Sequence, residues 1–125
     1  WDIHVLRDPT RGGVGTTLNE IAARSDVGMT LFEKDLPVKK EVNAVCELLG
    51  FDPLYIANEG KLIAIVPEKY AGEVLDIIRA DVFGRDAAII GDVTDQDPGK
   101  VFMETAIGGR RLVDMLTGEQ LPRIC

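Results

Sequence analysis

The last residue of the chain is a cysteine, and its thiol is the first candidate for chemistry. Cys125 ends the segment "GEQLPRIC", in which Pro122 stiffens the backbone and Arg123 places a cation close to the sulfur. A neighbouring cation favours the thiolate, which is the nucleophilic form of cysteine. Because packing does not account for a cysteine at a chain end, three chemical roles stay open: a nucleophile that is modified, a metal ligand or a redox thiol. A terminal cysteine without a role is the remaining alternative.

A carboxylate and an ammonium group flank a glycine in the central segment "ANEGKLIAI". Glu59 and Lys61 lie at the entry to an apolar run that is typical of a buried strand. A carboxylate at a strand end can act as a general base, because apolar surroundings raise its pKa. A turn with a solvated Glu59 and Lys61 would give the same pattern, so both interpretations stay open.

The segment "RDPTRGGVGTT" combines charged residues with glycines between a predicted strand and a predicted helix. Gly12 and Gly13 would let the backbone approach a ligand, and the N–H groups at a helix start favour an anion. Asp8 could cap the turn or face a metal, and Arg11 could hold a phosphate through two N–H groups. The segment is not a P-loop, because no Gly-Lys-Ser/Thr follows. A tight turn before a capped helix would look the same.

The single histidine and the second cysteine are weaker candidates. His4 alternates with apolar residues, so a packed or hydrogen-bonded structural role is expected, and a metal site built on several histidines is excluded. Cys46 lies beside the apolar stripe of a predicted helix and is expected to be a small buried hydrophobic residue. Without a secretory signal, reduced thiols in a cytoplasmic compartment are expected.

Length and composition limit the possible classes of protein. A chain of 125 residues, with 46% hydrophobic and 28% charged residues, can form one globular domain with its own core. No apolar run approaches the roughly 20 residues of a membrane span. The net charge of −7 argues against a nucleic acid or an anionic membrane as partner. Because the chain starts at Trp1 and enters directly into an apolar stretch, a C-terminal fragment of a longer parent is expected.

The elements that must position these residues are helices and strands in irregular alternation. Apolar periodicity predicts a helix that begins near Val14, further helices over 37–50 and 68–83, and strands over 2–6, 27–33, 61–67, 87–93, 100–106 and 110–116. The run 61–67 is continuously apolar, as in a strand covered on both faces. Without strict β-α-β alternation, the expected architecture is an α/β (α+β) sandwich, a mixed β-sheet with flanking helices.

Each of the two later helices carries one apolar face that is expected to point inward. The helix 37–50 has Pro37 at its start and Gly50 just past its end. Its inward face consists of Val38, Val42, Val45 and Leu49. The inward face of the helix 68–83 consists of Tyr70, Val74, Ile77 and Ile78.

Three segments, taken together, resemble a known family. "RDPTRGGVGTTLNEIA", "ANEGKLIAIVP" and the terminal "PRIC" are similar to the HypE-type carbamoyl dehydratases of [NiFe]-hydrogenase maturation, in the same order and over essentially the whole chain. The resemblance implies a C-terminal domain of the kind shared with aminoimidazole ribonucleotide synthetase and selenophosphate synthetase, over residues 1–117. A flexible tail, residues 118–125, would carry the cysteine. The family's N-terminal domain, which holds most of the ATP and Mg²⁺ site and forms the homodimer, would be missing, so this chain alone is not expected to turn over.

The resemblance also implies a reaction. Cys125 would receive a carbamoyl group from a partner carbamoyltransferase, and ATP would activate the oxygen of the thiocarboxamide. Loss of the elements of water would leave a thiocyanate, and the cyanide would pass to iron held by other maturation proteins. Glu59 would be the base that takes the amide protons. Asp8, Arg11, Gly12 and Gly13 would line the phosphate side of the ATP site, and no metal site is expected within this chain.

Two alternatives remain beside this resemblance. Another ATP-dependent synthetase of the same superfamily would have no need of a terminal cysteine. A non-catalytic module that delivers a metal would use Cys125 as a ligand, although a lone thiol without a nearby histidine or second cysteine makes a poor metal site.

Overall fold

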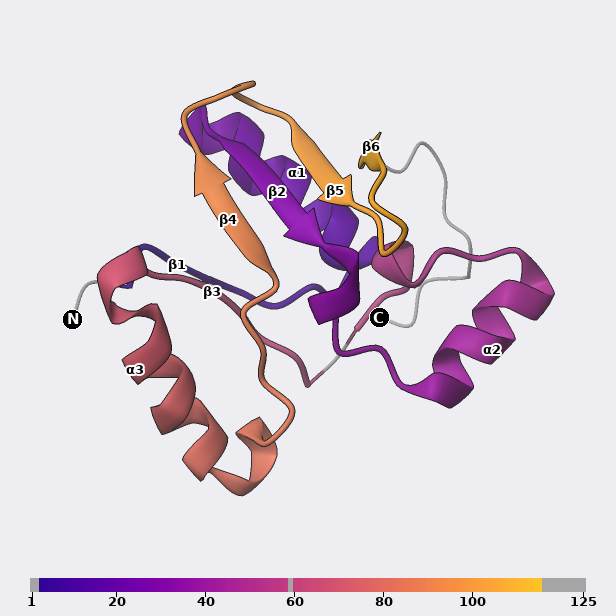
Figure 1. Cartoon of the computed structure of the whole chain (residues 1–125), viewed down its shortest axis with the longest axis horizontal. Helices are drawn as coiled ribbons and strands as arrows, with labels where there is room; N and C mark the ends of the chain where they lie inside the picture. The colour runs from indigo at the N-terminus through magenta and orange to yellow at the C-terminus, as the bar shows by residue number, and fades with distance from the viewer. Residues whose placement is uncertain (1–2, 59, 116–125) are drawn as a thin grey trace.

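Two β-sheets organise the chain, and a long helix covers the larger of them (Figure 1). The computed structural model describes residues 3–58 and 60–115. The elements are β1 (Val5–Arg7), α1 (Gly13–Ser25), β2 (Gly28–Phe32), α2 (Lys40–Leu49), β3 (Ile63–Ile65), α3 (Glu68–Ala80), β4 (Gly91–Thr94), β5 (Val101–Glu104) and β6 (Arg110–Leu112). Short 3₁₀ turns lie at Glu33–Asp35, Pro53–Tyr55 and Val82–Gly84. The predicted α+β class is confirmed.

The larger sheet is mixed, as predicted, with the strand order β4-β2-β5-β6. Strand β2 pairs antiparallel with β4 and parallel with β5, where Met29 lies opposite Val101. Strand β6 pairs antiparallel with β5. The parallel pair is possible because α2, β3, α3 and β4 all lie between β2 and β5 in the chain, which provides the long connection that parallel strands need.

The hydrophobic core lies between α1 and this sheet. Strand alternation directs Met29 and Leu31 to the core, while Thr30 and Phe32 lie on the other face and are only half-buried. The buried core residues are Leu18, Ile21, Ala22, Met29, Leu31, Leu54, Val101, Met103 and Val113. Their burial is the main favourable contribution to folding, and it is concentrated on α1 and the strands β2 and β5.

Strands β1 and β3 form a separate two-stranded antiparallel sheet. The prediction of a strand covered on both faces over 61–67 is wrong, because Ile63–Ile65 is half-buried and Leu62 is 64% exposed. The same continuous apolar run can occur in a central strand and in a two-stranded ribbon, so the sequence pattern does not distinguish these two kinds of strand. His4 is exposed instead of packed, although its backbone N–H donates to the Ile65 carbonyl at 2.8 Å.

Helix α2 has the predicted end but neither the predicted start nor the predicted inward face. It begins at Lys40 instead of Pro37, and it ends at Leu49 with Gly50 as a left-handed cap. The predicted inward face is exposed at each of its four positions, Val38, Val42, Val45 and Leu49. Cys46 is buried, as predicted. Figure 1 shows why the predicted face is exposed: α2 extends away from the larger sheet, and its main contact is with the turn Pro53–Tyr55.

Helix α3 also carries a partly open apolar face. It ends at Ala80, earlier than predicted, and the turn Val82–Gly84 follows. Tyr70, Val74 and Ile78 are half-buried, as their inward placement predicts in part, but Ile77 is exposed. The predicted strands over 100–106 and 110–116 are present in shortened form as β5 and β6, and the strand predicted over 87–93 is present as β4, which begins only at Gly91 and ends at Thr94. Within the described part of the chain, no helix has the length and apolar character needed to cross a membrane.

Candidate functional site

The glycine-rich loop leads from β1 into α1 and ends at two glycines in the left-handed region. Gly12, with φ 70°, is the N-cap of α1, and Gly13 follows with φ 71°. Gly12 has no side chain that could accept hydrogen bonds from the first turn, and this turn contains no acidic residue. The positive end of α1 is therefore not neutralised from within the helix. Asp8 and Arg11 are exposed on the same loop.

Gly13 allows close packing of two segments that are far apart in the sequence. A Cβ atom at Gly13 would lie 2.5 Å from the Leu54 carbonyl oxygen and 2.6 Å from the Ile56 carbonyl oxygen. Further along the helix, a Cβ at Gly15 would lie 2.9 Å from the ring of Tyr55. The space that a side chain would fill at Gly13 is therefore taken by residues 54–56. The predicted phosphate role of Gly13 stays a prediction, because packing alone already explains a glycine there.

Asn58 makes further contacts between the glycine-rich loop and the segment 54–58. Its backbone N–H donates to the carbonyl of Pro9 at 2.9 Å, and its side-chain amide donates to the carbonyl of Ile56 at 3.0 Å. Pro9 is fully buried. The structure thus brings the loop with Asp8 and Arg11 next to the residue that precedes Glu59. Glu59 and Cys125 themselves lie outside the described residues.

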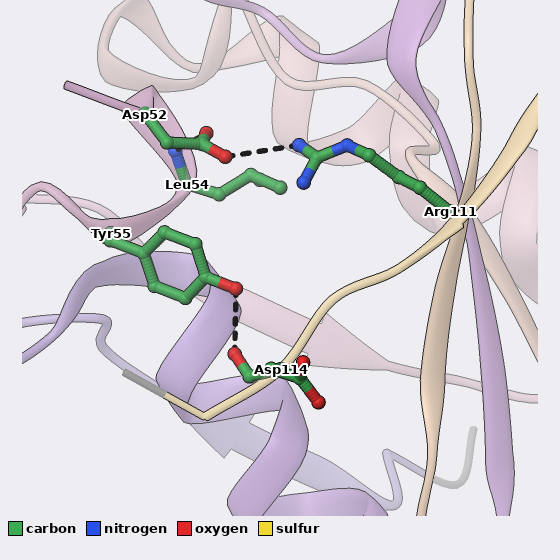
Figure 2. A network of polar contacts seen from close by, with 5 residues as sticks. All are labelled: Asp52, Leu54, Tyr55, Arg111 and Asp114. Atoms are coloured by element: carbon green, nitrogen blue, oxygen red, sulfur yellow. Dashed lines mark hydrogen bonds and ion pairs between the residues drawn. The ribbon is translucent and has the colours of Figure 1, made fainter. Parts of the chain in front are cut away.

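A polar network joins the same segment to the end of β6 (Figure 2). The guanidinium group of Arg111 pairs with the carboxylate of Asp52 at 3.0 Å, and the Tyr55 hydroxyl donates to the backbone carbonyl of Asp114 at 2.6 Å. Asp52 also accepts from the backbone N–H of Leu54 at 3.0 Å, so it caps the turn Pro53–Tyr55. Sequence reasoning missed this network. The Asp-Pro pair signals a capped turn, but no local pattern indicates Arg111 as its partner.

The Tyr55 hydroxyl keeps its proton in this environment. Burial raises its pKa above the ordinary value of 10.0, the charge of Asp52 raises it further, Arg111 lowers it, and Asp114 adds a smaller rise. The phenol therefore remains a hydrogen-bond donor to Asp114 throughout the neutral range.

Asn19 fixes the chain just before Asp114. It is 8% exposed in the middle of α1, and its side-chain amide donates to the carbonyls of Gly15 and Val113, both at 2.8 Å. A buried amide on a helix face requires such partners. A polar residue between Leu18 and Ile21 was a signal in the sequence, although it does not identify Val113.

A cavity of about 230 Å³ lies elsewhere, on the sheet face opposite α1. Thr30, Phe102 and Arg110 contribute to its lining, and the Arg110 guanidinium lies 3.8 Å from the centre of the Phe102 ring. None of the predicted site residues that the structure describes, Asp8, Arg11, Gly12 and Gly13, lines it. Across residues 3–58 and 60–115, no three cysteine, histidine or acidic side chains converge as metal ligands.

Comparison with curated proteins connects the chain to a group of hydrogenase maturation enzymes. It is 59% identical over 124 residues to the carbamoyl dehydratase HypE of Azotobacter vinelandii, and this match covers 99% of the chain and 36% of the relative. It is 44% identical over 123 residues to the carbamoyl dehydratase HypE of Escherichia coli K12, covering 98% of the chain and 36% of the relative. The chain thus spans only 36% of the length of these relatives.

Solved structures agree in fold. A crystal structure of the hydrogenase maturation protein HypE in complex with ATP matches with a TM-score of 0.92 and 53% identity, over 99% of this chain and 38% of the other. A HypE–HypF complex matches with a TM-score of 0.85 and 46% identity, over 90% of this chain and 36% of the other. Both confirm the resemblance drawn from the sequence motifs. Because residues 2–104 also match the AIR synthase related protein C-terminal domain, the chain, which is similar to HypE proteins over nearly its whole length, belongs to that family.

Proposed function

We propose that this chain is the C-terminal part of an ATP-dependent carbamoyl dehydratase, with residues 1–117 as a domain and residues 118–125 as a tail that carries Cys125. The observation that carries the proposal is the 59% identity over 124 residues to a carbamoyl dehydratase HypE. The resemblance drawn above from the sequence motifs, which include the terminal "PRIC", supports the same assignment. The remaining length of the relatives would supply the N-terminal domain.

The first step loads the carrier. The thiolate of Cys125 attacks the carbonyl carbon of a carbamoyl group that is held by a carbamoyltransferase. A new S–C bond forms, the bond to the donor breaks, and the product is a thiocarboxamide on Cys125. One of the similar solved structures is a HypE–HypF complex, which supports a protein partner for this chain.

The second step removes the elements of water. ATP activates the thiocarboxamide oxygen, which leaves as phosphate, and the two amide protons are lost as the C≡N bond forms. Thiocarboxamide and ATP thus give thiocyanate, ADP and phosphate. Glu59 would take the protons, and the hydrogen bond from the backbone N–H of Asn58, the residue before it, to the carbonyl of Pro9 supports this assignment.

The loop has the character that a polyphosphate requires. The first turn of α1 presents N–H groups without an acidic residue, and Arg11 is exposed beside it. Gly12 and Gly13 would contribute backbone N–H groups, and Asp8 is the carboxylate of the loop that could face a bound Mg²⁺. ATP supplies the phosphoryl group, and most ligands of ATP and Mg²⁺ would come from the N-terminal domain. A similar HypE was crystallised with ATP, which supports this assignment.

The thiocyanate product would be used in the assembly of the hydrogenase metal centre. A thiocyanate on Cys125 is a carrier of cyanide, and the acceptor would be iron held by a complex of further maturation proteins. The full-length protein would act as a homodimer formed by the N-terminal domains.

Intact mass spectrometry tests this function. The full-length protein is incubated with its carbamoyltransferase and carbamoyl phosphate, before and after ATP is added. A carbamoyl gain on Cys125, followed by loss of one water with ATP, is the expected result. If Cys125 stays unmodified while the transferase is active on a positive control, the carrier role is wrong, and metal delivery or another synthetase reaction takes its place.

A further inference from the structure

We propose that the sheet face opposite α1 is a docking surface for a partner protein, and that the cavity on this face receives an arginine side chain of that partner. The cavity has a volume of about 230 Å³ and is lined from all four strands of the larger sheet. In Figure 1, α1 lies behind β4, β2 and β5, and no described helix crosses in front of these strands. The inference is independent of the proposed reaction and gives this face no part in it.

Two aromatic side chains form the apolar part of the cavity. Phe32 on β2 follows the core residue Leu31, and Phe102 on β5 precedes the core residue Met103. Because successive side chains of a strand point to opposite faces, both rings lie on the face opposite α1, where they are half-buried. An aromatic ring in an open cavity can bind a cation on its face.

Carboxylates flank these rings on neighbouring strands. Asp92 on β4 is paired in register with Thr30, and Glu104 on β5 is paired in register with Phe32. Both carboxylates are exposed and line the cavity, and neither has a hydrogen bond or an ion pair with another described residue. Among the described residues that line the cavity, three are acidic and one is basic. The cavity therefore complements a positively charged group.

Arg110 shows that the cavity accepts a guanidinium group. Its guanidinium carbon lies 3.8 Å from the centre of the Phe102 ring, and one of its nitrogens lies 3.8 Å from a carboxylate oxygen of Asp97. The side chains of Arg110 and Asp97 are 54% and 49% exposed, and contacts with such exposure are weak. Arg110 is thus an internal occupant that an arginine of the partner can displace.

Arginine suits this combination of groups better than lysine does. A planar guanidinium group can stack on an aromatic ring while its N–H groups donate to carboxylates, whereas an ammonium group acts as a compact point charge. The net charge of −7 also favours a basic segment of a protein over a nucleic acid or an anionic membrane.

The test is fluorescence anisotropy with the full-length protein that contains this chain. The probe is a fluorescein-labelled peptide in which arginines alternate with glycines, and the reference peptide has lysine in place of each arginine. The arginine peptide should bind about three-fold or more tightly than the lysine peptide at physiological salt. The double variant Asp92→Asn/Glu104→Gln should weaken binding of the arginine peptide by about five-fold or more, because two charge-assisted contacts are lost.

Removal of the internal occupant should strengthen binding. Arg110→Gln frees the Phe102 ring and the carboxylate of Asp97, so the arginine peptide should bind about three-fold or more tightly than to wild type. Arg85→Gln is the matched control, since it removes the same charge at an exposed position outside the cavity. An Arg110 side chain that only supports the fold would not weaken the binding of an added peptide.

Further controls separate this cavity from the overall negative charge. Glu73→Gln/Asp76→Asn removes two exposed carboxylates of α3, and Glu20→Gln breaks an ion pair with Arg7 of 2.8 Å away from the cavity. Both variants should bind the arginine peptide within about two-fold of wild type.

Three results would overturn the inference. Absence of binding by both peptides would mean that this face is covered or holds no cation. Equal binding of the two peptides, or equal effects of the cavity variants and the control variants, would mean that only the net charge attracts the probe. Asp92, Glu104 and Arg110 are all exposed, so these variants should keep the fold, and thermal unfolding followed by circular dichroism checks this.

Discussion

At Gly13 the backbone of α1 comes as close to residues 54–56 as a glycine permits. A glycine in a loop before a helix is usually interpreted as a place where a ligand approaches, and here the approaching group is the chain itself. The distinction has a consequence for variants. A substitution at Gly13 should damage the fold as well as any binding of ATP, so loss of activity in such a variant is not evidence for a phosphate contact.

Gly13→Ala should lower the free energy of unfolding by about 2 kcal/mol or more, because positive φ and the contacts with two carbonyl oxygens both oppose a Cβ atom. Urea denaturation of the chain measures this. Gly72→Ala is the matched control, since Gly72 lies inside α3 and a Cβ atom there would meet nothing within 4 Å. That variant should gain up to about 1 kcal/mol from helix propensity. Equal effects at the two positions would contradict the packing at Gly13.

The raised pKa of Tyr55 predicts a pH-dependent contribution to stability. Below pH 10 the phenol is protonated in both the folded and the unfolded chain. Above it, the unfolded chain loses this proton first, so the contribution declines as the pH rises through the higher folded pKa. The difference in unfolding free energy between wild type and Tyr55→Phe should therefore be constant up to about pH 9 and shrink as the pH rises above 10. A constant difference would show that the phenol is not held as a donor.

Glu59→Gln tests the proposed base. The variant should accept the carbamoyl group normally, because loading does not use this carboxylate, and dehydration should slow by roughly 10²-fold or more, the usual range for loss of a general base. The same mass assay resolves both steps. Dehydration at the wild-type rate would mean that another group takes the amide protons.

Among the helices and strands, prediction from sequence succeeds best where the face that carries the regularly spaced apolar residues is also the face that the fold buries. Helix α1 and strands β2 and β5 are predictable because they supply the core, and their apolar spacing reflects one covered face. Helix α2 has an equally regular apolar face, yet most of that face is exposed. The spacing of apolar residues indicates which face of a helix is apolar, but it does not indicate whether another part of the molecule covers that face. For β3, likewise, the apolar run did not indicate that the strand is only half-buried. The contact of Asp52 with Arg111 could not be predicted because the two residues lie far apart in the sequence.

Cys46 and Leu48 allow a test of how α2 is oriented. Cys46 is 5% exposed and Leu48 is 85% exposed. In a Cys125→Ala background, Cys46 should react with a thiol reagent far more slowly in the native chain than in urea. Leu48→Gln should change the unfolding free energy by less than about 0.5 kcal/mol, as expected for a surface position. Rapid labelling of Cys46, or a large loss of stability at Leu48, would mean that another face of α2 is packed.

For the whole molecule, the exposed apolar side chains are the main departure from an ordinary surface. Leu48 on α2 and Phe83 after α3 are 85% and 97% exposed. Figure 1 shows α2 and α3 extending on two sides of the molecule, away from the larger sheet. On α2, Val42, Val45 and Leu49 are exposed as well, and a group of exposed apolar side chains on one helix marks a surface that associates. The HypE relatives contain further residues beyond the 36% that this chain spans.

The 125-residue chain by itself should therefore self-associate as its concentration rises, because water-exposed apolar faces favour contact between copies. Sedimentation velocity from micromolar to submillimolar concentration measures this. The double variant Leu48→Gln/Phe83→Ser should shift the association to higher concentration, whereas Glu20→Gln should not. A chain that stays monomeric throughout would show that these faces are too small or too polar to drive association.

The parallel pairing of β2 with β5 has a kinetic consequence. Met29 on β2 pairs with Val101 on β5, and α2, β3, α3 and β4 are all synthesised between them. On a growing chain, β2 and β5 therefore cannot pair until nearly all of the described residues have left the ribosome. Non-local pairing of this kind slows folding, since a long loop must close before the contact is formed. Until then the sheet that covers the apolar side of α1 lacks β5 and β6. During synthesis the incomplete core around α1 should therefore be prone to aggregation and bind chaperones.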